Sequence, residues 1–259
     1  MNRIGQSSPA FCHLPIPTAA DRISQDKFQV WEIFGEGGHF LPDHEAEFAK
    51  VLPSHSFEPQ LHAPISDNNI GSLNPRAREL AIRTHEETFA AAARLGIERI
   101  TIHPGNHSPL SRGHYGKLHE HTRQALRRLD TVALELGVTL FLENMAFGWA
   151  FETTSMDQLL DLTQGTEISY CLDVGHAHIS KRLPEFIAYA SRFGNVHLHD
   201  NKGVVDDHLT LGDGEVPWKD AVRALVDSGY GGTFVIESRD HASGRASQAL
   251  LAAQLRRST

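Results

Sequence analysis

Eight short apolar runs recur along this chain of 259 residues, with helical segments between most of them. The clearest helix is expected over roughly 117–136, where apolar side chains recur every three or four residues and form one face. Strands that alternate with helices predict a parallel sheet, because each helix carries the chain back to the start of the next strand. The strand-like runs lie near 3–8, 28–35, 59–64, 99–104, 138–144, 168–174, 195–200 and 232–238.

The length of the chain favours one way of arranging eight such units. A (β/α)8 barrel typically takes about 250 residues, and 40% of these residues are hydrophobic, enough for one large core. No linker, internal repeat or low-complexity segment divides the sequence. We therefore predict an α/β fold, a single-domain (β/α)8 TIM barrel over residues 1–259.

Glycines fall where several of the expected helices should stop, two to four residues before the next strand. These glycines are Gly96, Gly137, Gly194 and Gly229. A helix commonly ends at a residue in the left-handed conformation, which glycine adopts without steric cost. We expect all four to be left-handed helix caps.

Side chains alternate between the two faces of a strand, and this alternation separates polar from apolar residues here. Thr101 and His103 point one way, whereas Ile100 and Ile102 point the other. Asp173 and Glu237 likewise fall opposite the bulkiest apolar residues of their runs. The polar residues lie near the C-terminal ends of the strands, the end that carries the active site in (β/α)8 enzymes.

Imidazoles and carboxylates gather at or just beyond these strand ends. Both groups bind Zn, Mn, Fe or Co, and buried carboxylates without a cation would be costly. The pattern therefore indicates a metalloenzyme that uses divalent metal ions. The expected metal ligands are His62, His103, Glu143, Asp173, His176, His197, Asp206, His208 and Glu237.

Two further residues lie beside this set. His199 has the same strand parity as His197, and we expect it to orient a ligand or to contact substrate. Lys202 follows in a polar turn that either contacts substrate or is simply solvated. The segment 212–218, GDGEVPW, is typical of a loop that enters a helix near Pro217, and its glycines are only a weak signal for phosphate binding.

Composition excludes several classes of protein. The net charge of −8 disfavours a broad nucleic-acid-binding face, since such affinity comes mainly from Lys and Arg. Cys12 and Cys171 are isolated, so we expect core thiols rather than a disulfide or a thiolate zinc site. The chain has neither a membrane-spanning apolar run nor the start of a signal peptide, and we expect a cytoplasmic protein.

Six motifs together resemble a known group in their order and spacing. They are HPGNHS, LENM, CLDVGHAH, HLHDNKG, DDHLTLGDG and IES, between about residues 60 and 238. The set is similar to the xylose isomerase-like TIM-barrel superfamily, which contains sugar and sugar-phosphate isomerases and epimerases as well as endonuclease IV.

The two branches of that superfamily imply different metal contents. The epimerase branch implies one divalent ion, with His176 facing substrate, and the endonuclease IV branch implies three zinc ions. The epimerase ion would be held by Glu143, Asp173, His197 and Glu237. In the endonuclease IV branch two more ions would be present. His62, His103 and Glu143 would hold one of them, and His176, Asp206 and His208 would hold the other.

The residues after His62 favour the first branch. Endonuclease IV has an aromatic residue and a leucine there that push into DNA, whereas this chain has Ile65, Ser66 and Asp67. We expect an isomerase or epimerase of a small sugar or sugar phosphate, in which Glu143 and Glu237 remove and return a proton beside a metal-polarised carbonyl. The alternatives are a trinuclear phosphoester hydrolase and a non-catalytic metal-dependent binding protein. The oligomeric state stays open.

Overall fold

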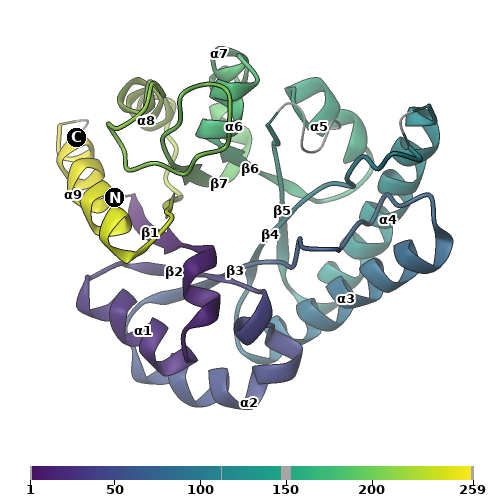
Figure 1. Ribbon diagram of the computed structural model, residues 1–259, viewed down its shortest axis with the longest axis horizontal. Coiled ribbons are helices and arrows are strands. Elements are labelled where there is room, and N and C mark those ends of the chain that lie inside the picture. Colours follow the sequence, from purple (N-terminus) through teal and green to yellow (C-terminus); the bar gives the residue numbers. More distant parts are fainter. Residues whose placement is uncertain (1, 112, 147–152, 258–259) are drawn as a thin grey trace.

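The computed structural model describes residues 2–111, 113–146 and 153–257, and in these ranges eight parallel strands close into a barrel in chain order (Figure 1). This confirms the (β/α)8 prediction, with each strand within two residues of its expected bounds. The strands are β1 (Arg3–Ser7), β2 (Val30–Phe34), β3 (Glu58–His62), β4 (Arg99–Ile102), β5 (Thr139–Glu143), β6 (Ser169–Asp173), β7 (Phe193–Leu198) and β8 (Thr233–Glu237).

Helices surround the barrel, and the longest lies where the periodicity placed it, over Tyr115–Leu136. Short 3-10 segments cover Pro9–His13, Gly37–His39, Leu52–Ser54 and Ala190–Arg192. The α-helices are α1 (Ile16–Gln25), α2 (Leu41–Val51), α3 (Pro75–Arg94), α4 (Tyr115–Leu136), α5 (Met156–Leu162), α6 (Val174–Ile179), α7 (Leu183–Ile187), α8 (Trp218–Asp227) and α9 (His241–Leu255).

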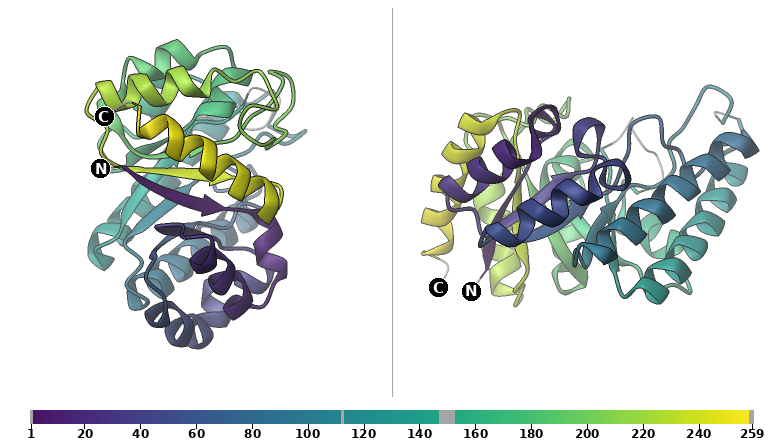
Figure 2. Two further views of the ribbon diagram at one scale, coloured as in Figure 1. Left: turned by 90° about the vertical axis from the view of Figure 1, so that its left-hand side faces the viewer. Right: turned by 90° about the horizontal axis from the view of Figure 1, so that it is seen from below.

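The barrel closes where β1 pairs with β8, in register from Arg3 beside Thr233 to Ser7 beside Glu237. Figure 2 shows α9 packed along this seam, at the outer side of β1 and β8. The closure brings Glu237, at the end of the last strand, to the same edge as the C-terminal ends of the other strands. The candidate ligands of β3 to β8 therefore meet at one mouth of the barrel.

Apolar and polar residues occupy different layers of the interior. The outward sides of the strands, including Ile100, Leu172 and Phe234, pack under the helices in a continuous apolar core. The inside of the barrel is polar instead: the Asn195 amide donates to Glu32 Oε2 at 2.8 Å and to Thr101 Oγ1 at 3.1 Å. The alternation within the strands thus predicted which face each side chain takes.

Three of the four glycine caps are confirmed, and one prediction is wrong. Gly96, Gly137 and Gly229 have positive φ angles of 71°, 72° and 83° at helix ends. Gly194 is not a cap but lies within β7, where it packs against an aromatic ring. A Cβ atom at Gly194 would lie 2.1 Å from Cε1 of Phe141, so the position requires glycine for space rather than for its φ angle.

Cys12 and Cys171 are both buried free thiols, as predicted. Burial raises the pKa of the Cys171 thiol well above its ordinary value, because the thiolate would be desolvated. Among the helices of the described residues, none combines the length and the apolar character that crossing a membrane requires.

Candidate active site

A cavity of about 200 Å³ opens at the C-terminal ends of the strands. One part of its wall is apolar and the rest consists of imidazoles and carboxylates. This places most of the predicted ligands around one small space, at the end of the barrel where (β/α)8 enzymes act. The lining residues are Pro9, Phe34, His62, Ile65, His103, Glu143, Met145, His176, Asp206, His208 and Glu237.

Four side chains form an inner set at the base of this cavity. Glu143, Asp173, His197 and Glu237 each offer a donor atom, and these atoms all lie within 4.8 Å of one another. His197 Nδ1 is 3.2 Å from Glu237 Oε1 and 3.5 Å from Glu143 Oε2. All four residues are buried. The structure thus brings together residues from β5, β6, β7 and β8 that the sequence separates widely.

Behind the inner set lies Glu32, a residue that the sequence analysis missed. Its carboxylate is fully buried on β2, and Oε1 lies 2.9 Å from His197 Nε2. A carboxylate only accepts hydrogen bonds, so Nε2 carries the proton, and in the neutral ring Nδ1 has a lone pair that faces Glu143 and Glu237 and is available to a metal ion. An acidic residue on the barrel-facing parity of a strand, between Trp31 and Ile33, was the signal that could have found it.

Asn144 fixes the turn from β6 into α6. Its amide Oδ1 accepts from Asp173 N at 2.8 Å, and its Nδ2 donates to Asp173 O at 2.9 Å. Asp173 in turn caps the short helix, since its Oδ1 accepts from His176 N at 2.6 Å. The His176 ring donates from Nδ1 to Asn144 O at 3.0 Å, which turns Nε2 toward Asp206. Asn144 was also missed.

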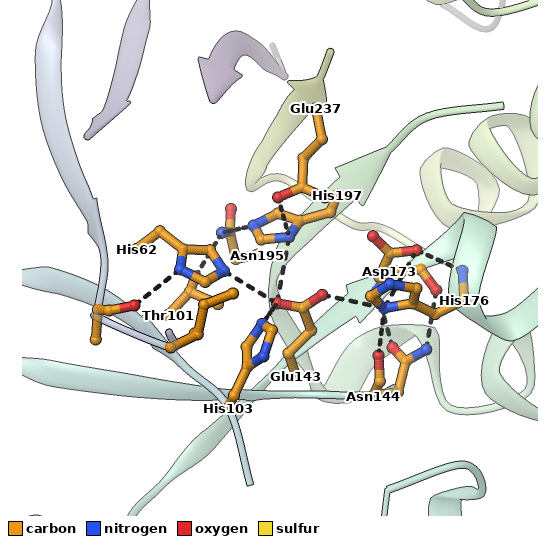
Figure 3. Close-up of polar contacts among 12 residues, drawn as sticks. His62, Thr101, His103, Glu143, Asn144, Asp173, His176, Asn195, His197 and Glu237 are labelled. Carbon is orange, nitrogen blue, oxygen red and sulfur yellow. Dashed lines mark hydrogen bonds and ion pairs between the residues drawn. The ribbon is translucent and has the colours of Figure 1, made fainter. Parts of the chain in front are cut away.

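A second cluster joins His62 and His103 to Glu143. The two rings contact each other edge to face, and Glu143 Oε2 lies 3.1 Å from His103 Nε2 and 3.6 Å from His62 Nε2. His62 donates from Nδ1 to Ala63 O at 3.0 Å, so its Nε2 faces the carboxylate. Figure 3 shows Glu143 between this pair and the side of the site that holds Asp173 and His176.

An outer cluster surrounds Asp206 at the mouth of the cavity. Asp206 Oδ2 lies 3.1 Å from His176 Nε2 and 3.0 Å from His208 Nε2. The fully buried His199 reaches the same carboxylate, with Nε2 3.2 Å from Asp206 Oδ1 and 3.2 Å from Asp173 Oδ1. His199 thus contacts two expected ligands directly, in agreement with its strand parity.

Lys202 and the segment 212–218 lie outside the cavity lining. Lys202 is exposed. The loop does enter a helix at Trp218, as predicted. Its amides at Gly212 and Val216 donate to the buried Asp200 carboxylate at 2.8 and 3.0 Å, so this turn wraps around an internal anion. Those two amides already donate to Asp200 and are therefore not available to bind a phosphate group.

Burial and neighbouring charge act against each other throughout the site. Burial alone would raise the pKa of Glu143, but the imidazoles of His197, His103 and His176 hold it well below its ordinary value. Burial raises the pKa of Glu237 more than His197 and His208 lower it. Burial disfavours protonation of His199, yet the adjacent carboxylates raise its pKa to about 9.

The donor set fits a divalent metal ion. Asp173 Oδ2 and His197 Nδ1 are buried and have no hydrogen-bond partner among the described residues. The charged neighbours of Glu143 in the described ranges are imidazoles, so three buried carboxylates face one another without a Lys or Arg to balance them. Nitrogen and oxygen donors of this kind bind Zn²⁺, Mn²⁺, Fe²⁺ or Co²⁺ and would be stabilised by such an ion.

Comparison with known proteins agrees with this architecture. The profile of the xylose isomerase-like TIM barrel family matches residues 20–258. The chain belongs to this family. An uncharacterised protein of Methanocaldococcus jannaschii is 27% identical over 246 residues, which cover 92% of this chain and 84% of that protein. A probable endonuclease 4 of Mycobacterium tuberculosis is 28% identical over 180 residues, 65% of this chain and 68% of that one.

Among solved structures, a D-tagatose 3-epimerase-like protein superposes with a TM-score of 0.91. It is 25% identical, and the match covers 99% of this chain and 98% of that protein. The sequence resemblance to this family is thereby confirmed, with relatives from both its epimerase and its endonuclease branches.

Proposed function

We propose that this chain is a divalent-metal-dependent isomerase or epimerase of a small sugar. The observation that carries this proposal is the inner set of Glu143, Asp173, His197 and Glu237 at the base of a small, partly apolar cavity. The cavity of about 200 Å³ is smaller than typical drug-sized pockets of roughly 300–1,000 Å³. It therefore suits one small molecule. The similarity to a D-tagatose 3-epimerase-like protein supports the same reaction class.

The inner set would hold the ion, which supplies polarisation of a carbonyl and its neighbouring hydroxyl and so acidifies the C–H bond beside them. Glu143 and Glu237 reach the site from β5 and β8, two strands that are not neighbours in the barrel. A carbon held between them presents a different face to each carboxylate. One glutamate can remove the proton and the other can return it, as epimerisation requires.

Two further features of the cavity support a small, uncharged sugar as the substrate. None of the described residues that line the cavity is Lys or Arg, which favours an uncharged sugar over its phosphate. Phe34, Ile65 and Met145 form an apolar wall that excludes water from the reacting carbon. His176 lines the same space and would face the hydroxyl groups of the substrate.

A second candidate is a phosphoester hydrolase that uses several metal ions. The cluster of His62, His103 and Glu143 favours it, as does the similarity to a probable endonuclease 4. The net charge of −8 and the absence of Lys and Arg from the described cavity lining disfavour a DNA substrate.

The two candidate functions can be distinguished by measuring whether a substrate proton exchanges with solvent. Removal and return of a proton through Glu143 or Glu237 exchanges it with solvent, so ketoses incubated in deuterated water with metal-loaded enzyme should gain deuterium beside the carbonyl. Phosphoester hydrolysis has no such step. Exchange with at least one sugar would support the proposal. Metal-dependent cleavage of abasic duplex DNA without exchange across a sugar panel would overturn it, and the absence of both reactions would favour a binding protein.

A further inference from the structure

We propose that Ser238 is a positioning residue, which holds Glu237 in place for metal binding and proton transfer through a buried hydrogen-bond network at the seam of the barrel. Ser238 directly follows Glu237 in the motif IES. Its role in proton transfer rests on the function proposed above, in which Glu237 exchanges a proton with the substrate.

The polar groups of Ser238 are all hydrogen-bonded. Its Oγ accepts from Gln6 Nε2 at 2.6 Å and donates to Asp240 O at 2.9 Å. Its main-chain N–H donates to Ser7 O at 3.3 Å, and its carbonyl oxygen accepts from Ser8 Oγ at 2.8 Å. The side chains of this network are buried, with Gln6, Ser8 and Ser238 at most 2% exposed. The four hydrogen bonds therefore fix the main chain at the end of β8.

The carboxylate of Glu237 depends on this anchor. Its Oε1 lies 3.2 Å from His197 Nδ1, and its Oε2 lies 3.9 Å from His208 Nδ1, so these contacts are with imidazoles of the site itself. The end of β8 decides where the side chain starts. A displacement of about 1 Å at a reacting group can cost about 100-fold in rate. A network that holds this strand end thus acts on the proton transfer although it does not line the cavity.

Two unfavourable features of the sequence are explained by this network. Gln6 lies on the outward side of β1, the same side as the core residue Ile4, where an apolar side chain would pack. Gly244 lies in α9, although glycine destabilises a helix relative to alanine. A Cβ atom at Gly244 would lie 2.1 Å from Gln6 Oε1, so the helix leaves room for the amide. Both features are required if Gln6 is to reach Ser238.

The proposed reaction makes a displaced Glu237 visible in one direction. Glu237 removes the proton from one epimer and Glu143 removes it from the other, and each carboxylate then exchanges that proton with solvent. Deuterium at the reacting carbon of the first epimer is lost only through Glu237. The second epimer can lose deuterium through Glu143 alone, when this carboxylate returns a solvent proton to the same face. Epimerisation needs both carboxylates.

Ser238→Ala tests the proposal with both epimers deuterated at the reacting carbon and with enzyme saturated with Mn²⁺. Epimerisation and deuterium loss from one epimer should fall by about 10–100-fold, whereas deuterium loss from the other epimer should stay close to the wild-type rate. Ser247→Ala is the matched control, because Ser247 is a buried serine of α9 whose Oγ accepts from Leu211 N at 3.1 Å. It should behave as the wild type. An equal fall for both epimers in Ser238→Ala would overturn the proposal.

Metal affinity gives a second measurement that needs no sugar. Because Glu237 belongs to the inner set, Ser238→Ala should weaken Mn²⁺ binding by about 10-fold in competition with a chelator, and Ser247→Ala should not. Unchanged affinity in Ser238→Ala would refute the positioning role. Weaker binding in this variant, together with no exchange into any sugar by the wild type, would support the positioning role and overturn the proposed function alone. The two failures are therefore distinguishable.

Circular dichroism would first establish that each variant folds. If Ser238→Ala does not fold, Gln6→Met takes its place, since methionine fills a similar volume among apolar neighbours but cannot donate to Ser238 Oγ. The same unequal loss of deuterium and the same weaker Mn²⁺ binding are expected. Wild-type Mn²⁺ affinity in Gln6→Met would then overturn the proposal.

Discussion

Glu32 Oε1 lies 2.9 Å from His197 Nε2, and neither side chain is exposed to solvent. This contact links the polar interior of the barrel to the candidate metal site, because it decides which nitrogen of His197 faces Glu143 and Glu237. A carboxylate behind a metal-binding histidine fixes the orientation of the ring and raises its basicity as a ligand. The barrel centre therefore contributes to the site although it does not line the cavity.

We expect Glu32→Gln to weaken metal binding by about 10–100-fold while the barrel still folds, because the amide no longer fixes the tautomer of His197. Metal affinity measured by competition with a chelator would show this. Gln60→Leu is the matched control: Gln60 is paired in register with Glu32 but has no hydrogen-bonded side-chain atom among the described residues. Equal affinity in wild type and Glu32→Gln would show that His197 needs no such partner.

Glu237→Gln tests the catalytic pair. The amide keeps the volume of the side chain but cannot take up the substrate proton and is a weaker ligand than the carboxylate. We expect kcat to fall by about 10²–10⁴-fold, the range typical of a lost general acid or base, together with weaker metal binding. Glu215→Gln, an exposed position on the loop after β7, should retain full turnover. Wild-type turnover in Glu237→Gln would remove this residue from the mechanism.

The sequence predicted the barrel and the meeting of the inner set at one mouth for the same reason. Residues such as His103 and Asp173 follow short apolar runs, and the alternation of side chains along a strand assigns each to a face. All parallel strands of a barrel end at one mouth, so residues at strand ends meet without further information. This geometry explains why Glu143 and Glu237, far apart in the chain, could be placed together in advance.

Other features depend on contacts that no local pattern contains. Gly194 looks like a helix cap because it precedes a strand, yet its role depends on Phe141, a residue of another strand. The approach of Asp206 to His199 depends on the path of the loop after β7, and spacing does not give that path. The parity of Glu32 along its strand could have predicted that it faces the barrel interior. A lone acidic residue in an apolar run, however, does not indicate which side chain it contacts.

Gly194→Ala tests the correction at β7. The added methyl would lie 2.1 Å from Phe141 Cε1, and the guanidinium of Arg99, 4.5 Å from the centre of that ring, limits its movement. We expect a loss of about 1–3 kcal/mol in the free energy of unfolding, as for other overpacked cores. Gly116→Ala in α4 is the matched control, since its Cβ meets no atom within 4 Å. It should be neutral or stabilising by about 0.5 kcal/mol in urea unfolding.

His85, which is not itself a candidate ligand, provides a test of pH dependence. Burial in α3 lowers the pKa of its imidazole from 6.5 to about 4, and Nδ1 donates to Ala81 O at 2.9 Å. The folded-state pKa is below the unfolded one, so the unfolded chain binds the proton first as pH falls below 6.5. His85 therefore has no effect on the pH dependence above pH 6.5 and destabilises the fold progressively down to about pH 4.

The full effect corresponds to about 3 kcal/mol, since each pKa unit is worth about 1.4 kcal/mol. In His85→Gln the amide stays neutral at every pH. The difference in unfolding free energy between wild type and variant should therefore be constant above pH 6.5 and shift in favour of the variant below it. Urea unfolding of both proteins across this range measures the difference directly. A difference that does not change with pH would show that His85 is protonated equally in the folded and unfolded chains.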